Sequence, residues 1–194
     1  MPSLTPGLLL MIAGVLSGLS WKVPQIYAMD RALFQKVNTV HVDAAYDRLS
    51  AILRWWGTKW ALMAAIAVGL IWQWELTWTL IPAALLMAAI ERAVKLTVRR
   101  PRPFIDLHDA ILRQNPSPKD DSFPSGDATR AWFIFSVICF GLDLAPAFSL
   151  VAAILAVLVS IGRVRLGAHY PLDVWAGFCI GWGAGLVWAS YLGC

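Results

Sequence analysis

Residues 162–192 read GRVRLGAHYPLDVWAGFCIGWGAGLVWASYL, a polar start followed by a long apolar segment. From residue 170 onward the segment is long enough for one helix to cross the hydrocarbon core of a bilayer, which takes about 20 residues. Gly177, Gly181 and Gly185 recur every fourth residue, so they share one helical face and let a neighbouring helix approach closely. The stretch therefore predicts a tightly packed membrane-spanning helix, and we interpret its glycines as architectural.

Comparable apolar segments recur towards the N-terminus, separated by short turns or polar connections. They cover about residues 55–74, 76–94, 129–144 and 146–162. No Lys or Arg precedes the apolar run from Leu8 to Leu19, so we expect a retained first span that continues toward Tyr27, and not a cleaved signal. With a composition that is 59% hydrophobic and 14% charged, the pattern predicts an all-α, polytopic membrane bundle of about six transmembrane helices, as a single domain over residues 1–194.

Residues 29–54, between the first two expected spans, mix charged and apolar side chains. The apolar residues recur at roughly helical spacing and are Leu33, Val37, Val40, Ala44 and Leu49. This pattern favours an amphipathic helix at the membrane surface. A solvated loop with weak helical character is the alternative.

The cysteines give no sign of a cofactor. Cys139, Cys179 and Cys194 lie in or beside apolar segments, and their spacing fits neither a metal site nor a disulfide framework. We therefore interpret them as packing residues and expect no redox or zinc role.

The basic residues mark one face of the expected bundle. All 16 Lys and Arg lie in, or close to the ends of, the first, third and fifth connections. The positive-inside rule taken alone would place this face in the cytoplasm. A face that binds an anionic ligand also requires cations, so the charge count leaves the orientation open.

The first of three polar clusters runs from Lys95 to Pro103 at the end of the third expected span. The ammonium of Lys95 and the forked guanidinium of Arg102 are suited to binding phosphoryl oxygens. Proline on either side of Arg102 stops the helix and favours an extended segment. The intervening Arg99 and Arg100 are interpreted as membrane-flanking charges that attract anionic headgroups.

The second cluster is Pro124-Ser125-Gly126-Asp127, directly before the fourth span. A helix start offers unpaired backbone N–H groups, glycine lets an anion approach closely, and the Ser125 hydroxyl adds a donor. The cluster is a candidate oxyanion cradle. A simple turn with Ser125 or Asp127 as helix cap is the alternative.

The third cluster combines Arg163 with His169 and Asp173. The spacing of four places His169 and Asp173 on one helical face. A carboxylate there can fix the imidazole tautomer and stabilise the charged ring, which leaves the other ring nitrogen free to attack phosphorus. Ionisable groups beside a span are costly, so this pair indicates function.

These three clusters resemble, in order and spacing, the signature of the type 2 phosphatidic acid phosphatase superfamily. That superfamily includes lipid phosphate phosphatases and is related to vanadium haloperoxidases. Its signature is K-x6-R-P, then P-S-G-H, then S-R-x5-H-x3-D, and the match covers residues 95–173. The resemblance implies a helical membrane phosphatase that works without a metal or other cofactor.

The resemblance also implies a role for each matching residue. Lys95, Arg102 and Arg163 would bind the substrate phosphate, and Ser125 with the Gly126 backbone would complete its cradle. His169 would be the nucleophile that forms a phosphohistidine, and Asp173 would orient it. The donors would count most in the transition state, where charge gathers on the equatorial oxygens.

Two positions depart from the signature. Gly162 replaces the Ser that precedes Arg163, and Asp127 stands where the family has the His that protonates the leaving group. An ordinary Asp, with a pKa near 3.9, is ionised at neutral pH and cannot donate a proton. The departure at Asp127 therefore leaves the general acid, and with it the substrate, open.

Three explanations of Asp127 compete, beside lost or unusual activity. Burial could raise its pKa, although nearby cations would lower it. His108, in the same polar connection, could donate instead. Alternatively, the leaving group is itself a phosphate, as in a polyprenyl diphosphate, and needs little protonation.

The sequence thus predicts an integral membrane lipid phosphatase for a phosphate or diphosphate monoester of a lipid. A lipid-to-lipid phosphotransferase and a catalytically silent lipid-phosphate-binding protein are the alternatives. The expected partners are the bilayer and a membrane lipid phosphate, with no nucleic acid. The resemblance places the protein in a bacterial inner membrane with the site facing the periplasm, against the raw charge count.

Overall fold

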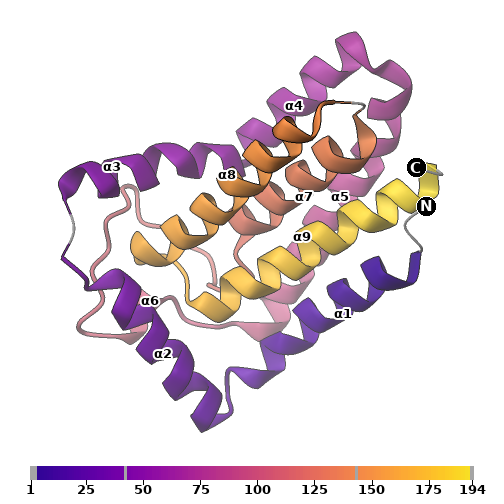
Figure 1. The fold of residues 1–194 in the computed structure, drawn as a ribbon. Helices are drawn as coiled ribbons and strands as arrows, with labels where there is room; N and C mark the ends of the chain where they lie inside the picture. The colour runs from indigo at the N-terminus through magenta and orange to yellow at the C-terminus, as the bar shows by residue number, and fades with distance from the viewer. Residues whose placement is uncertain (1–3, 42, 143, 193–194) are drawn as a thin grey trace.

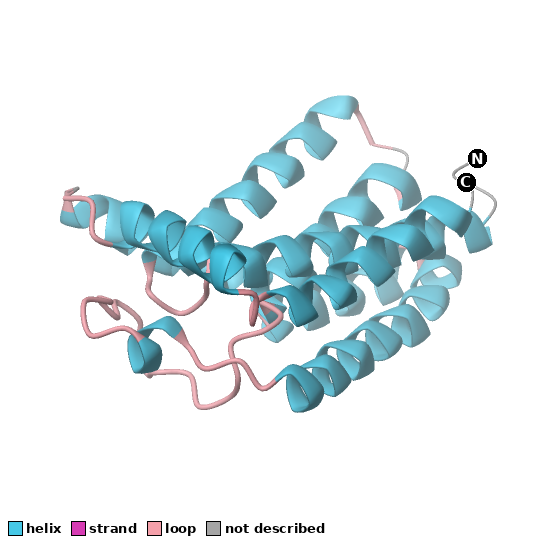
Figure 2. Ribbon diagram, turned by 90° about the horizontal axis from the view of Figure 1, so that it is seen from below, coloured by secondary structure: helices cyan, strands magenta, loops and turns pink. Residues whose placement is uncertain are grey.

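The structure, a computed structural model, describes residues 4–41, 43–142 and 144–192. Within these ranges all regular structure is helical, as expected (Figures 1 and 2). In chain order the elements are α1 (Leu4–Ser20), α2 (Pro24–Asn38), α3 (Ala44–Leu53), the 3-10 helix η1 (Arg54–Gly57), α4 (Lys59–Trp72), α5 (Trp74–Val98), the short α6 (Pro103–Asp106), α7 (Gly126–Gly141), α8 (Pro146–Arg165) and α9 (Pro171–Leu192).

Helix α9 lies at the centre of the bundle, with α1 and α7 packed along it (Figure 1). A Cβ atom at Gly181 would lie 2.1 Å from the Thr129 carbonyl oxygen of α7, and one at Gly185 would lie 2.1 Å from the Ser136 Cβ. Both distances are far below van der Waals contact, so only glycine permits this approach of α7 to α9. The predicted architectural role of the glycine stripe is confirmed.

The apolar core continues on the α5 side of this seam. One buried cluster contains Met87 of α5, Phe133 of α7, and Ile180 and Trp188 of α9. Large apolar side chains face outward on the periphery, for example Leu150 of α8, which is 63% exposed. A soluble protein rarely presents so many exposed apolar side chains, so the outer faces fit a lipid environment.

Fewer of the described helices qualify as membrane spans than the six that the sequence predicts. By length and composition, α8 and α9 qualify as membrane-crossing helices, and the bent pair α1–α2 would make a third. Helix α4 is apolar but short, and α7 has 16 residues with Asp127 and Arg130 in its first turns. The helical membrane class is supported, whereas a count of six is not confirmed.

The first expected span does not continue to Tyr27 as one straight helix. Helix α1 ends at Ser20, and α2 begins at Pro24 after a bend of 100°. Proline lacks the N–H that would continue the α1 hydrogen-bond pattern, but it is well suited to the first position of a new helix.

The 29–54 region forms two helices and a 3-10 turn in place of one helix. The Asp43 carboxylate accepts a hydrogen bond from the Ala45 N–H (3.1 Å) and so starts α3 anew. On α2, Asp30, Phe34 and Asn38 are buried at a spacing of four residues. Helix α2 is therefore amphipathic and packed, so the alternative of a solvated loop is wrong.

The three polar clusters meet at one end of the bundle. This end gathers the last turn of α5, the first turns of α7 and α9, the last turn of α8 and the connection over residues 99–125 (Figure 1). Helices α2 and α3 border the same end, whereas α1 begins and α9 ends at the opposite one. Figure 2 shows the long connection looping across this end of the bundle.

Candidate active site

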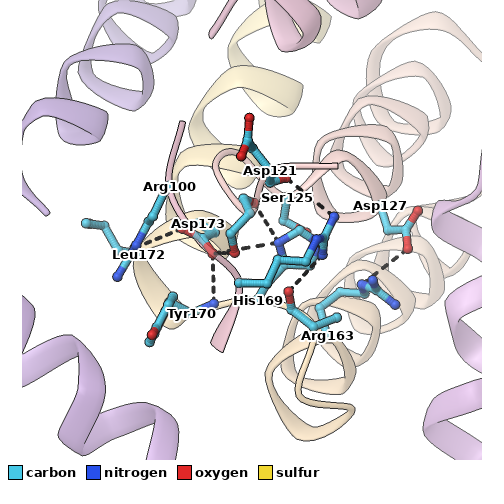
Figure 3. Close-up of polar contacts among 12 residues, drawn as sticks. Arg100, Asp121, Ser125, Asp127, Arg163, His169, Tyr170, Leu172 and Asp173 are labelled. Carbon is cyan, nitrogen blue, oxygen red and sulfur yellow. Dashed lines mark hydrogen bonds and ion pairs between the residues drawn. The ribbon is translucent and has the colours of Figure 1, made fainter. Parts of the chain in front are cut away.

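A polar cavity of about 210 Å³ lies where the clusters meet. Its walls come from η1, α5, α7 and α8, and from the connections that follow α5 and α8. The lining residues are Arg54, Glu91, Lys95, Arg102, Gln114, Pro118, Asp120, Gly126, Asp127, Arg130, Arg163 and His169. The structure therefore brings together residues of all three predicted clusters (Figure 3).

His169 is buried in the connection between α8 and α9, and its surroundings fix its tautomer. Nδ1 lies 2.8 Å from the Ser122 carbonyl oxygen, which can only accept, so Nδ1 carries the proton and donates it. Nε2 then bears the lone pair, and the Arg102 Nη1 group lies 3.2 Å away and donates toward it. Burial and the charge of Arg102 lower the pKa of His169 to about 3, so the imidazole is neutral at physiological pH.

Asp173 lies behind His169 and is fully buried. Its Oδ2 is 3.7 Å from His169 Nδ1, farther than the Ser122 carbonyl. The Ser122 hydroxyl and the Tyr170 N–H (2.8 Å) both donate to this carboxylate. Ser122 therefore contacts both residues of the predicted pair. No local sequence pattern indicates this role, because both contacts cross from a distant part of the chain.

Arg100 corrects the interpretation of the first cluster. Its side chain does not face headgroups: the residue is 0% exposed and pairs with Asp30 of α2 (2.6 Å) and with Asp173 (2.8 Å). Its guanidinium also lies over the Tyr170 ring, 4.0 Å from the centroid. The preceding Arg99 has a left-handed backbone (φ 48°) and stays exposed, so this turn sends the two arginines to opposite sides.

A signal for this pairing was present in the sequence. Asp30 lies four residues before Phe34 on the buried face of α2, and a carboxylate on such a face requires a cationic partner. That partner could have been sought among the arginines of the first cluster, although the pattern does not say which one.

Lys95 and Arg102 both line the cavity, and both are buried. Each pairs with one oxygen of the same carboxylate: Lys95 Nζ lies 2.9 Å from Asp120 Oδ2, and Arg102 Nη2 lies 2.7 Å from Asp120 Oδ1. Burial would raise the pKa of Asp120, but hydrogen bonds and charges from Lys95 and Arg102 hold it well below its usual range. Asp120 was not among the predicted residues.

Arg163 reaches the same cavity from α8. Its Nη1 donates to the Gln114 side-chain oxygen (2.7 Å), and its Nε lies 3.2 Å from Asp127 Oδ2, an ion pair without hydrogen-bond geometry. Nothing in the sequence pattern pointed to Gln114, which joins the site through the long connection. The three predicted phosphate ligands thus line one cavity.

Asp127 is held between two guanidinium groups. Arg130 Nη2 lies 3.0 Å from its Oδ1, whereas Arg163 approaches the other oxygen, Oδ2. Arg130 is itself fixed by Glu91 Oε2 (2.9 Å) and by the Gly57 carbonyl oxygen (2.8 Å). Two fixed cations favour the ionised carboxylate, so this geometry argues against a protonated Asp127.

Ser125 and Gly126 form the start of α7, as the cradle hypothesis requires. The Ser125 carbonyl oxygen accepts from the Thr129 N–H, whereas its side chain makes no capping bond. Within the described part of the chain the buried Ser125 Oγ has no hydrogen-bond partner. A Cβ at Gly126 would lie 2.1 Å from Glu91 Oε1, so a side chain there would force the Glu91 carboxylate to move.

His108 is exposed and lies outside the residues that line the cavity. This position disfavours it as the proton donor. At Gly162, a Cβ would make ordinary contact with Ser50 of α3 (3.5 Å), so the family's Ser would fit. In the described ranges no group of three or more His, Cys, Asp or Glu side chains is arranged to hold a metal ion.

Comparison with known proteins agrees with the motif and the fold. The model of the PAP2 superfamily matches residues 72–193. The chain belongs to this superfamily. An undecaprenyl-diphosphatase of Sulfolobus acidocaldarius is 30% identical over 164 residues, which covers 82% of this chain and 74% of that protein. A phosphatidylglycerophosphatase B of Bacillus subtilis is 40% identical over 68 residues, which covers 31% of this chain and 34% of that protein.

Two solved structures resemble this one. The crystal structure of Aquifex aeolicus LpxE has a TM-score of 0.74 and 29% identity and covers 82% of this chain and 94% of its own. The transmembrane PAP2-type phosphatidylglycerolphosphate phosphatase of Bacillus subtilis has a TM-score of 0.83, covering 97% and 96% of the two chains. Its identity of 19% supports the fold alone.

Proposed function

We propose that this PAP2 protein is an integral membrane lipid phosphatase that hydrolyses a phosphate or diphosphate monoester of a lipid. One observation carries the proposal: His169 has its Nδ1 proton committed to the Ser122 carbonyl and its Nε2 lone pair in a cavity lined by cations. A neutral imidazole so placed is a nucleophile facing an anion site. The names of the relatives, two lipid phosphatases among them, support the same class of substrate.

The reaction would run in two displacements at phosphorus. Nε2 of His169 forms a bond to phosphorus as the bond to the leaving oxygen breaks, which gives a phosphohistidine. Water then attacks phosphorus, the N–P bond breaks, and phosphate leaves with Nε2 regenerated. Positive charge that develops on the ring is stabilised by Asp173, 3.7 Å from Nδ1.

Lys95, Arg102 and Arg163 would bind the phosphoryl oxygens in this scheme, and the Ser125 hydroxyl with the Gly126 N–H would complete the cradle. The unpartnered Ser125 Oγ supports this assignment, because a buried hydroxyl without a partner is unfavourable until a ligand accepts from it. These cations supply the charge that transition-state stabilisation requires, so the scheme needs no metal ion.

We infer a preference for a diphosphate, such as a polyprenyl diphosphate, from the state of Asp127. An ionised Asp127 cannot protonate an alkoxide, whereas a phosphate leaving group departs with little assistance. The carboxylate between Arg163 and Arg130 is instead suited to orient water for hydrolysis of the phosphohistidine. The undecaprenyl-diphosphatase relative is consistent with this preference.

For the location we propose a bacterial inner membrane with the cavity on the periplasmic side. Labelling of Cys194 in a variant that lacks Cys139 and Cys179 tests the orientation. A membrane-impermeant thiol reagent added to spheroplasts is expected to leave Cys194 unlabelled until the membrane is permeabilised. Labelling of Cys194 in sealed spheroplasts would reverse the assignment.

The function itself is tested by phosphate release from the purified protein in detergent. A lipid monophosphate and a polyprenyl diphosphate are compared at equal mole fraction in the micelle. We expect release from at least one, faster from the diphosphate, and inhibition by vanadate. No release from either substrate by folded protein would contradict the proposal.

A further inference from the structure

We propose that Asp120 sets the affinity of the phosphate site by occupying it, so that its carboxylate leaves when substrate binds and returns when phosphate departs. This inference rests on the proposed function, because it takes the Lys95–Arg102 pair to be the phosphate-binding site. It adds a residue outside the three signature clusters to the determinants of binding.

The position of the Asp120 carboxylate resembles that of a bound phosphoryl group. Its two oxygens are shared between two cations, at 2.9 Å from Lys95 Nζ and 2.7 Å from Arg102 Nη2. Arg102 also lies 3.2 Å from His169 Nε2, so an anion held by Arg102 lies beside the proposed nucleophile. A phosphoryl group bound for attack would need the same donors.

Hydrogen bonds to backbone carbonyls hold Lys95 and Arg102 in position without this carboxylate. Arg102 Nε donates to the backbone carbonyl of Asp120 (2.6 Å), and Arg102 Nη1 donates to the carbonyl of Ala168 (2.8 Å). Lys95 Nζ donates to the backbone carbonyl of Asp121 (2.9 Å). The side chain of Asp120 is therefore dispensable for positioning Lys95 and Arg102. Its removal leaves both cations in place to bind a phosphoryl group.

Exposure allows the exchange that the proposal requires. The side chain of Asp120 is 47% exposed, whereas those of Lys95 and Arg102 are 6% and 3% exposed. The carboxylate can therefore swing into solvent, while the buried cations need an anion whenever it does. A phosphate monoester carries about 1.5 to 2 negative charges against one for Asp120, and so displaces it.

Competition of this kind weakens the binding of every ligand of the site by the same factor. The apparent dissociation constant equals the intrinsic one divided by the fraction of molecules in which Asp120 is displaced. Substrate and inorganic phosphate are affected by the same factor, so Asp120 also limits inhibition by the product. We expect this factor to be about tenfold, since two partly screened ion pairs hold the carboxylate.

The test is the dissociation constant of inorganic phosphate, measured by titration calorimetry of the full-length protein in detergent. Asp120→Asn removes the competing charge, and Asp121→Asn removes the same charge from the next residue while keeping the carbonyl that Lys95 contacts. We expect phosphate to bind Asp120→Asn about tenfold more tightly than the unaltered protein, and Asp121→Asn to differ by less than about twofold. In turnover, Asp120→Asn should lower KM by a similar factor without raising kcat.

Three outcomes would overturn the inference. If phosphate binds Asp120→Asn no more tightly, or more weakly, Asp120 merely orients the cations. If Asp121→Asn tightens binding as much as Asp120→Asn, the effect is general electrostatics and not occupation of the site. If phosphate binds none of the three proteins, the cavity is no phosphate site, and the proposed function fails together with the inference.

Discussion

The two sides of the His169 ring are built differently. On the Nδ1 side, a buried chain of contacts runs from Ser122 through Asp173 and Arg100 to Asp30 of α2. On the Nε2 side, the cations line an open cavity and are balanced by carboxylates, one of them 47% exposed. The first side is a fixed support for the ring, and the second is a surface where one anion can replace another.

Loss of the ring itself should have the largest effect. His169→Gln removes the nucleophile from the border between the two sides, so we expect kcat to fall at least about 10³-fold. Binding of inorganic phosphate should persist, because the cavity cations remain. Turnover within tenfold of the unaltered protein would show that another group attacks phosphorus.

Breaking the fixed side should destabilise the fold. Arg100→Met leaves two buried carboxylates, Asp30 and Asp173, without their cation, and we expect a loss of about 3–5 kcal/mol in the free energy of unfolding. Arg99→Met is the matched control, because that side chain is exposed, and its effect should stay within about 0.5 kcal/mol. Denaturant titration in detergent measures both; equal losses would refute the assignment of Arg100 to a buried support.

Acid should weaken the folded state through His169. Its pKa is lowered to about 3 in the folded protein, so between pH 6.5 and that value the unfolded chain binds a proton that the folded one does not. Stability should therefore fall by about 1.4 kcal/mol per pH unit as pH drops through this window. The same titration on His169→Gln should show a shallower slope, and an identical slope would mean that His169 is not buried as a neutral ring.

The smallest expected change concerns the leaving group on the open side. Asp127→His restores the proton donor of the family signature, so we expect about a tenfold gain on a lipid monophosphate and little change on a diphosphate. Asp127→Asn, which removes the charge without adding a donor, is the control and should show no gain. Loss on both substrates with Asp127→His would show that Asp127 is itself an adapted catalytic group.

The sequence predicted the open side better than the fixed one. The residues of the open side lie in short motifs with recognisable spacing, and the structure brings them into one cavity. They are Lys95, Arg102, Asp127, Arg163 and His169. Motifs of this kind identify residues by local order along the chain, and the helices that carry them converge at one end of the bundle.

The fixed side depends on contacts between distant segments. Asp30 lies 70 residues from Arg100, and Ser122 lies 47 from His169, so no local pattern joins them. Arg99 and Arg100 are adjacent and chemically identical, yet only Arg100 is buried, directly after the left-handed turn at Arg99. The same limit applies to Asp120, whose partners are revealed only by the folded loop.

Single residues, more than average hydropathy, determine where the helices begin and end. Proline at residue 24 ended the first apolar helix earlier than hydropathy predicts, and the Asp43 cap divided an expected single helix. Hydropathy averages over a window and therefore misses breaks that single residues impose. Composition and the lengths of the apolar segments predicted the helical membrane class, because few other folds tolerate so much apolar surface.

The proposed reaction depends on His169 carrying the phosphoryl group. The direct measurement is a rapid-mixing experiment in which a polyprenyl diphosphate labelled on its terminal phosphorus reacts with excess enzyme, is quenched in alkali, and is digested for mass spectrometry. We predict that label appears on His169 before phosphate is released. Its decay should match the rate of phosphate release. Phosphate release without label on any residue would contradict the account and indicate direct attack by water.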